Sequence, residues 1–203
     1  MNIEIKKSKK RVSYKKAMLF LNRRVDEVKS GKNNEIIWIL EHPKTYTAGV
    51  SYSKEDIIDK KIKIIKTNRG WKITLHNPNQ KIVYFVINLN IRKKDIRKLI
   101  SVIENSIIEF LKIFEIYAKK DKKNIGIWVK NKKIAAIGLR VSRWIAFHGC
   151  SINISNNLKQ YEKIVPCGLD NKNVTSVANE KKIKPTNYEQ KLANIFIKNI
   201  NNI

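Results

Sequence analysis

Apolar residues recur with a helical period in three segments of the chain. Ser13 can cap a helix over the first segment, and Gly31 supplies its stop. Asp95 is the N-cap candidate of a second, longer helix, and Pro185 precedes a third. The apolar positions that carry the period are Tyr14, Ala17, Met18, Leu21, Val25 and Val28, then Ile96, Leu99, Ile100, Ile103, Ile107, Phe110, Leu111 and Phe114, and finally Tyr188, Leu192, Ile195 and Phe196. The pattern predicts helices at the start, middle and end.

The segments between these helices have strand patterns. Residues 35–40 and 81–89 are continuous apolar runs, which are typical of strands covered on both faces. From Trp71 to His76 apolar and polar residues alternate, so His76 leaves its strand on the polar side, opposite Leu75. A short strand is expected at residues 62–65.

The region after the second helix is also predicted to be β. Residues 126–141 form two strands around a tight turn at Asn131 and Lys132. Residues 143–154 continue as a strand with Trp144, Ala146, His148 and Cys150 on one side. We therefore expect one domain over residues 1–203, of the α+β (mixed α/β) class, with a central mixed β-sheet flanked by helices.

The chain is strongly basic, with a formal net charge of +26 from 43 Lys and Arg against 17 Asp and Glu. Such a surface attracts polyanions, but heavy use of lysine, asparagine and isoleucine throughout is also what codon composition alone produces. The lysines are spread along the chain without a recognisable nucleic-acid motif. Nucleic-acid binding stays a secondary hypothesis, and the run KKSKKR at residues 6–11 is interpreted as a solvated strand end or turn.

Cys150 and Cys167 are the two cysteines of the chain. The sequence has no signal peptide and no apolar run near the ~20 residues that span a bilayer, which predicts a cytoplasmic protein with two free thiols and no membrane contact. No Cys/His spacing resembles a zinc site, so we expect no metal.

Cys167 lies between a proline and a glycine in a predicted loop, where it either fills space or reacts. A thiol with a pKa of ~8.5 is only a few per cent thiolate at neutral pH, so a nucleophile needs a neighbouring cation. Spacing alone cannot select that cation from 43 basic residues. Residues 41–49, 68–80 and 143–153 each bring a His near a strand end, and for each His packing and catalysis both remain open.

Read together, three ordered segments resemble the lipoyl(octanoyl) transferase family. They are LEHPKTYTAG at residues 40–49, KKIAAIGLRVSRWIAFHGCSINI at 132–154 and IVPCGLDNKNVTSV at 164–177. The resemblance implies the fold of biotin and lipoate protein ligases. It also implies an acyltransferase of lipoate biosynthesis that uses no cofactor. Its donor would be octanoyl-acyl carrier protein, and its acceptor a lysine on lipoyl domains of 2-oxoacid dehydrogenases or on the glycine cleavage H protein.

By this resemblance Cys167 corresponds to the acyl-accepting nucleophile and Lys133 to the lysine that activates it, as a Cys/Lys dyad. The resemblance also implies an acyl pocket built from three stretches of the chain. These are Arg69, Gly70, Trp71, Lys72, Ile73, Thr74, Leu75 and His76, then Ala136, Ile137 and Gly138, then Gly149, Cys150 and Ser151. Backbone N–H groups near Gly70 and Gly138 are candidate oxyanion donors.

The chain departs from the family pattern within the same stretches. Trp71 stands where the family has glycine, and Asn77 and Asn79 replace the two glycines of the following turn. Asparagine tolerates positive φ, so the turn can be kept. An indole at residue 71 is expected to alter acyl-chain preference or activity. Ala136 replaces a serine, and Cys150 replaces a small apolar residue.

Two other functions remain open from the sequence. An ATP-dependent lipoate or biotin ligase of the same fold would require nucleotide, although no phosphate loop of the G-x-x-x-x-G-K-[ST] type is present. A degenerate, non-catalytic relative would use its basic surface to bind acidic partners or nucleic acid. For the transferase we expect a monomer with no nucleic-acid partner, whose positive charge speeds the encounter with acidic carrier and acceptor domains.

Overall fold

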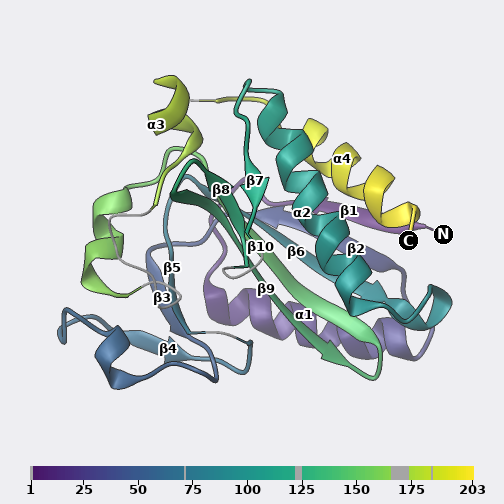
Figure 1. Cartoon of the computed structure of the whole chain (residues 1–203). Helices are drawn as coiled ribbons and strands as arrows, with labels where there is room; N and C mark the ends of the chain where they lie inside the picture. The colour runs from purple at the N-terminus through teal and green to yellow at the C-terminus, as the bar shows by residue number, and fades with distance from the viewer. Residues whose placement is uncertain (1, 71, 122–124, 166–173, 184) are drawn as a thin grey trace.

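Two β-sheets and their covering helices make up the computed structural model of this chain, which describes residues 2–70, 72–121, 125–165, 174–183 and 185–203 (Figure 1). The larger sheet has the order β1 (Ile3–Lys7), β2 (Glu35–Leu40), β6 (Gln80–Asn88), β10 (Ile145–Asn153), β9 (Lys132–Ser142), β8 (Ile127–Val129) and β7 (Lys119–Lys120). β1 and β2 are parallel and all other neighbours are antiparallel, so the predicted mixed sheet is confirmed.

The smaller sheet consists of β4 (Ile64–Lys66), β3 (Thr45–Ala48) and β5 (Ile73–His76) in that order. β3 pairs with β4 in parallel and with β5 antiparallel. Within the described residues, three 3-10 helices lie in the connections: η1 (Lys54–Asp56), η2 (Leu89–Ile91) and η3 (Leu158–Lys163). The small sheet lies beside the large one, at the lower left of Figure 1.

Four α-helices are present in the described chain: α1 (Tyr14–Lys29), α2 (Ile96–Lys112), α3 (Val177–Lys181) and α4 (Glu189–Asn201). The predicted caps are confirmed, since Ser13 Oγ accepts from the Lys16 N–H and Asp95 Oδ1 accepts from the Lys98 N–H at 2.9 Å. α2 and α4 pack side by side over one face of the large sheet, and α1 covers the other (Figure 1).

The two faces of the large sheet receive alternate side chains of β2. Ile36, Trp38 and Leu40 pack with α1, whereas Ile37 and Ile39 pack with α2 and α4. All six residues of β2 are buried, which confirms a strand covered on both sides. We call the side under α2 and α4 the helix-pair face and the side under α1 the cavity face.

Several predicted boundaries were wrong by one or two residues. The strand expected at 62–65 is β4 at 64–66, and the hairpin turn lies at Lys130 and Asn131, with Lys130 at φ 53° and Lys132 opening β9. Trp144 belongs to the β9–β10 turn, where Arg143 and Trp144 both have positive φ, and not to the strand. Two positive-φ residues in succession are typical of the tight hairpin turns that match strand twist.

Some elements were not predicted at all. β1 and β7 are lysine-rich, β3 lies between Pro43 and Gly49, two residue types that disfavour regular strands, and α3 is a short helix in a predicted loop. Each is short, so its period is too weak to detect in a sequence. The interpretation of residues 6–11 as a strand end and turn is confirmed, because β1 ends at Lys7.

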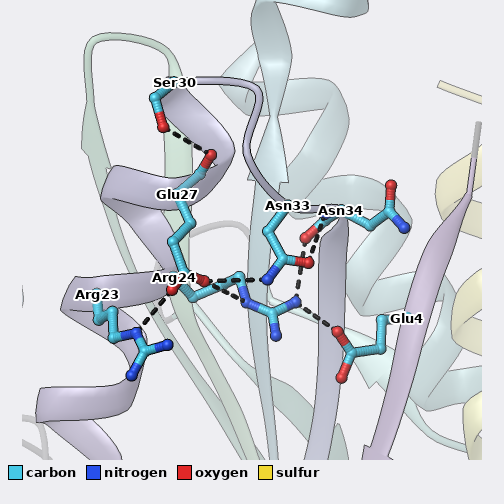
Figure 2. A network of polar contacts seen from close by, with 7 residues as sticks. All are labelled: Glu4, Arg23, Arg24, Glu27, Ser30, Asn33 and Asn34. Carbon is cyan, nitrogen blue, oxygen red and sulfur yellow. Dashed lines mark hydrogen bonds and ion pairs between the residues drawn. The ribbon is translucent and has the colours of Figure 1, made fainter.

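Arg24 is the polar exception on the buried side of α1, and Figure 2 shows what it binds. Its guanidinium donates to Glu4 on β1 at 2.5 Å and to the Asn34 carbonyl at 3.2 Å, and it also lies 3.4 Å from Glu27. These contacts tie α1 to β1 and to the start of β2. They fix the helix whose first residue, Tyr14, lines the cavity described below.

No helix within the described ranges is long and apolar enough to cross a bilayer.

Candidate active site

A cavity of about 390 Å³ lies between the cavity face of the large sheet and strand β5 of the small sheet. Its walls come from the first residue of α1, from β5 and β6, and from β9 and β10. Its size is within the roughly 300–1,000 Å³ range of ligand pockets. Thirteen of its lining residues carry a polar side chain or a thiol or are glycine, so the walls offer both hydrogen bonds and close backbone approach.

Many of the residues that the sequence singled out line this cavity. From the first stretch these are Arg69, Lys72, Thr74 and His76; from the second Ala136, Ile137 and Gly138; and from the third Gly149, Cys150 and Ser151. Ile73 and Leu75 point the other way and pack with Tyr46, Tyr161 and Ile164. Because side chains alternate along a strand, β5 contributes only every second residue to the cavity. Gly70 is not among the lining residues, and Trp71 lies outside the described residues.

Lys133 projects into this cavity from the start of β9, although its side chain is 92% buried. Its Nζ lies 5.5 Å from the centre of the Trp128 ring, a cation–π contact that suits a buried ammonium. Gly126 provides the space, since a Cβ there would overlap the Lys133 side chain and lie 2.7 Å from the Ala135 carbonyl oxygen. No carboxylate among the described residues forms an ion pair with Lys133.

The other predicted member of the dyad, Cys167, lies outside the described residues, so its pairing with Lys133 stays a prediction. The chain that follows it returns to the described structure at Val174, which forms a parallel bridge with Lys133. The Thr175 N–H donates to the Lys133 carbonyl at 2.9 Å. Before Cys167, the Val165 N–H donates to the Asp56 carbonyl at 2.8 Å.

His42 is held in place through both of its ring nitrogens. Its Nδ1 bonds the Val12 carbonyl at 2.6 Å, and its Nε2 bonds the Tyr84 hydroxyl at 2.8 Å. A carbonyl only accepts, so Nδ1 carries the proton and Nε2 accepts from Tyr84. Burial lowers the pKa of His42 and raises that of Tyr84 well above its ordinary value, so both stay neutral at pH 7.

His76 lies on the cavity side of β5, stacked on Tyr14 with 6.0 Å between ring centres. Its Nδ1 bonds Gln80 Oε1 at 3.1 Å. Burial lowers the pKa of His76 well below its ordinary value, and the neighbouring His42 and Arg69 lower it further. At neutral pH it is therefore an uncharged imidazole.

Arg69 supplies a second buried positive charge to the cavity, in addition to that of Lys133. Its guanidinium donates to the Thr47 carbonyl at 2.9 Å, to the Thr47 hydroxyl at 3.0 Å and to the Gly70 carbonyl at 3.0 Å. The arginine thus connects β3, the segment before β5 and the cavity wall. Its charge acts on the aromatic and imidazole groups around it and opposes protonation of His76 and His148.

His148 departs from the regular alternation of β10 that placed it beside Ala146 and Cys150. Its φ is 69°. Its ring stacks on that of Phe147, with 5.0 Å between ring centres, and Phe147 packs on the cavity face with the residues under α1. Its Nε2 is buried without a hydrogen-bond partner. Burial, with smaller contributions from Arg69 and Arg140, lowers the pKa of His148 to about 4.

The next residue, Gly149, allows β10 to approach β6 closely. A Cβ at Gly149 would overlap the Val83 carbonyl oxygen, so a side chain there is not compatible with this strand spacing. Cys150 follows and is buried between the cavity and the helix-pair face. Burial raises the pKa of the Cys150 thiol far above its ordinary value, which makes it a poor nucleophile.

Sequence reasoning missed part of the wall. Tyr14, Ser51, Ile82, Tyr84 and Ile125 also line the cavity. The sequence placed Tyr14 in a helix and Tyr84 in a strand. The signal that could have marked them is that each puts a hydroxyl group into an otherwise apolar pattern.

In the turn after β5, Asn79 has φ 64°, as expected for a replaced glycine, and Asn77 donates to the Asn157 carbonyl at 2.9 Å. No cluster of metal-ligating side chains occurs within the part of the chain that the structure describes.

Known proteins with related sequences show the family of this chain. Residues 13–197 match the family model described as the lipoyl protein ligase A/B catalytic domain. The chain is 42% identical over 169 residues to an octanoyltransferase of Wolbachia pipientis subsp. Culex pipiens (strain wPip), covering 81% of this chain and 82% of that protein. It is 40% identical over 191 residues to an octanoyltransferase of Bartonella tribocorum, covering 87% of this chain and 78% of that protein.

Solved structures show the same fold at low identity. A lipoate-protein ligase A bound with ATP aligns with a TM-score of 0.72 at 13% identity, covering 97% of this chain and 83% of that one. A bi-partite lipoate protein ligase from Thermoplasma acidophilum aligns with a TM-score of 0.67 at 12% identity, covering 98% of this chain and 82% of that one. The predicted ligase-like fold class is confirmed.

The cavity, its glycine-lined strands and the matching family model define the class: the chain belongs to the lipoyl protein ligase A/B catalytic-domain family. Within that family, its relatives at 42% and 40% identity are named octanoyltransferase. The predicted membership and the prediction of an acyltransferase are confirmed.

Proposed function

We propose that this protein transfers an octanoyl group from octanoyl-acyl carrier protein to a lysine of a lipoyl domain, through a thioester on Cys167. The support is the sequence likeness to octanoyltransferases together with a buried lysine, Lys133, at a cavity of acyl-pocket size. The acceptors are the lipoyl domains of 2-oxoacid dehydrogenases and the glycine cleavage H protein. The catalytic unit is residues 1–203, acting as a monomer in the cytoplasm.

In the first half of the reaction, the Cys167 thiolate attacks the carbonyl carbon of the donor thioester. The ammonium of Lys133 stabilises this thiolate. It then gives its proton to the carrier thiolate as that thiolate leaves, so Lys133 is a neutral amine at the start of the second half. Backbone N–H groups near Gly70 and Gly138 are the candidate oxyanion donors, and of these two residues Gly138 lines the cavity. The product of this half is an octanoyl thioester on Cys167.

In the second half, the neutral amine of the acceptor lysine attacks the Cys167 thioester. A C–N bond forms, the C–S bond breaks, and the amine loses one proton as the amide forms. Lys133 carries that proton between the amine and the leaving thiolate. Since a thioester is converted to an amide, no nucleotide is consumed.

The covalent step is tested by weighing the intact protein after incubation with octanoyl-acyl carrier protein. We expect the added mass of one octanoyl group, on the peptide that contains Cys167. Cys150 serves as the internal control, because its buried thiol should stay unmodified. An adduct that persists in Cys167→Ser, or one that maps to Cys150, would show that the nucleophile is wrongly assigned.

The competing ligase activity is separated by nucleotide requirement. The 13%-identical structural neighbour bound with ATP shares the fold only, so it does not decide the reaction. We expect amide formation on a lipoyl domain from the carrier-bound octanoyl group without ATP. A strict ATP requirement with free octanoate as substrate would instead identify a ligase.

The net charge of +26 suits an encounter with acidic carrier and acceptor domains. Exposed charges are screened by salt, so the transfer rate at subsaturating carrier should fall between low and physiological ionic strength. A rate from carrier-bound substrate that is independent of salt would mean that the charge reflects composition alone. Octanoyl-coenzyme A, which lacks the acidic protein, is the matched donor for comparison.

A further inference from the structure

A chain of hydrogen bonds crosses the molecule from His76 to the backbone beside Lys133. His76 Nδ1 bonds Gln80 Oε1 at 3.1 Å, and Gln80 Nε2 bonds Asn153 Oδ1 at 3.0 Å. Asn153 Nδ2 bonds the Thr175 carbonyl at 2.9 Å. The Thr175 N–H in turn donates to the Lys133 carbonyl at 2.9 Å. Gln80 and Asn153 are paired directly across β6 and β10, and both are buried.

The direction of this chain is fixed from its far end. The Thr175 carbonyl can only accept, so Asn153 must present its NH₂ group to it and its oxygen to Gln80. Gln80 must then donate to Asn153, which turns its own oxygen towards His76. The second N–H of Gln80 donates to the Tyr161 hydroxyl at 2.8 Å. Reversing the Gln80 amide would set its oxygen against Asn153 Oδ1, and reversing the Asn153 amide would set its oxygen against the Thr175 carbonyl.

His76 therefore donates from Nδ1, and its Nε2 carries a lone pair. Nε2 of His76 has no hydrogen-bond partner among the described residues. Unlike Nε2 of His148, it is not fully enclosed by protein atoms. Because His76 lines the cavity, this lone pair faces open space there. The ring is held by stacking on Tyr14 and by His42, 5.3 Å away between ring centres.

We propose that Gln80 and Asn153 are positioning residues that lock His76 as the Nδ1–H tautomer, so that His76 Nε2 accepts a hydrogen bond from the attacking lysine amine. This rests on the proposed function. The reacting end of an octanoyl thioester has a carbonyl and no N–H or O–H group, so an acceptor on the wall cannot bind it. The amine is the substrate that has N–H groups at the reacting atom.

An N–H bonded to Nε2 fixes the orientation of the amine and leaves its nitrogen lone pair free to attack the acyl carbon. The lowered pKa of His76 keeps the ring uncharged, so Nε2 remains an acceptor at neutral pH. His76 orients the amine, and the amine proton itself passes to Lys133 and the leaving thiolate as described above. The buried chain thereby links the acceptor-lysine site to the backbone of Lys133.

The tautomer is tested directly by ¹⁵N NMR of the imidazoles in the whole protein, with His76→Asn used to assign the signals. We expect a protonated Nδ1 and an unprotonated Nε2 for His76 at pH 7. In Gln80→Leu the acceptor for Nδ1 is lost, and the His76 signals should change to the Nε2–H form or to a mixture. A protonated Nε2 in the unmodified protein would overturn the proposal.

The two half-reactions are then timed separately in single-turnover experiments. In Gln80→Leu we expect octanoyl-thioester formation within about threefold of the unmodified protein and amide formation slower by about tenfold to a hundredfold, the size of one lost hydrogen bond in a transition state. Asn156→Ala is the matched control, because Asn156 also donates to Asn153 Oδ1, at 3.1 Å, yet is not part of the chain to His76. It should leave both rates within about threefold.

Equal slowing of both half-reactions in Gln80→Leu, or the same slowing in Asn156→Ala, would reduce the chain to a structural role and overturn the proposal. If Gln80→Leu does not fold, Asn153→Ala takes its place, since it frees the Gln80 amide to rotate and should also mix the tautomers. If the unmodified protein forms no acyl-enzyme, the proposed function fails, while the NMR signals still decide whether His76 is locked.

Discussion

The two faces of the large sheet use the same strands but hold different groups. On the helix-pair face, β2, β6 and β10 pack apolar side chains against α2 and α4, as in the contact between Phe85 and Phe196 at 5.3 Å. On the cavity face, the neighbouring residues of the same strands include Tyr84, Gly149 and Ser151, and all three histidines of the chain lie on this side. One face is closed by apolar packing, and the other lines the cavity that we propose as the active site.

This difference follows from how each face satisfies polar groups. Apolar packing needs only shape and volume, so the helix-pair face is closed by two amphipathic helices. The cavity face leaves a space open, and its imidazoles and amides are instead fixed by bonds that end on backbone carbonyls, Val12 for His42 and Thr175 for Asn153. Such buried polar chains are ordered only when every member is paired.

The largest expected effect on stability lies on the helix-pair face. Phe196→Ala removes a fully buried ring and leaves a cavity beside Phe85. We expect the free energy of unfolding to fall by about 3–5 kcal/mol, measured by urea denaturation. A loss below about 1 kcal/mol would mean that this face is not the main source of stability. Residual folded protein should retain its half-reaction rates, since α4 does not line the cavity.

Lys133→Met tests the cavity face with the opposite expectation. It removes the proposed proton carrier and replaces a buried ammonium with an apolar chain of similar length. Octanoyl transfer should fall at least about a hundredfold, whereas the free energy of unfolding should stay within about 1 kcal/mol or rise, because a buried charge no longer needs compensation. A variant that loses stability as much as Phe196→Ala would erase the contrast between the faces.

The sequence predicted the helix-pair face and part of the site. Helical periods and caps found α1, α2 and α4, and the alternation from Lys72 to His76 found which side of β5 is polar. Periodicity cannot rank residues of a strand that is buried on both faces, so Tyr84 and Ile82 were not recognised as cavity residues. The family resemblance supplied Lys133, since nothing in its spacing separates it from Lys130 and Lys132.

Other features of the site depend on contacts between distant segments. The bond between Gln80 and Asn153 requires the pairing of β6 with β10, and the bond to Thr175 requires the chain to return beside Lys133. His148 is turned by a positive φ that regular alternation does not anticipate. The roles of Cys167 and Trp71 remain predictions, because both lie outside the described residues.

The histidines make the stability of the cavity face depend on pH. The pKa of His148 is about 4 in the folded protein, whereas it has its ordinary value of 6.5 in the unfolded chain. Between pH 4 and pH 6.5 the unfolded chain therefore binds more protons than the folded protein. Its contribution to stability is complete above pH 6.5 and is lost as the pH falls towards 4. Between pH 7 and 5 this loss amounts to about 2 kcal/mol.

His148→Asn isolates that contribution, since asparagine tolerates the positive φ at this position. Urea unfolding at pH 7 and pH 5 should show a loss about 2 kcal/mol smaller in the variant than in the unmodified protein. His42 and His76 also have lowered pKa values and will account for a remaining loss in both. An identical pH dependence in the two proteins would contradict the assignment to His148.

The smallest expected effects come from the caps of the helices on the two faces, which form a matched pair. Ser13→Ala and Asp95→Ala each remove the side chain that accepts from the first turn of α1 or α2, and each should lower the free energy of unfolding by about 1 kcal/mol.

The effects of these two substitutions on activity should differ. Tyr14, next to Ser13, lines the cavity and stacks on His76, so loosening the start of α1 should raise KM. The start of α2 lines no part of the cavity, so Asp95→Ala should leave KM unchanged. If both variants shift KM equally, loss of stability on either face is transmitted to the site, and the two faces are not separable.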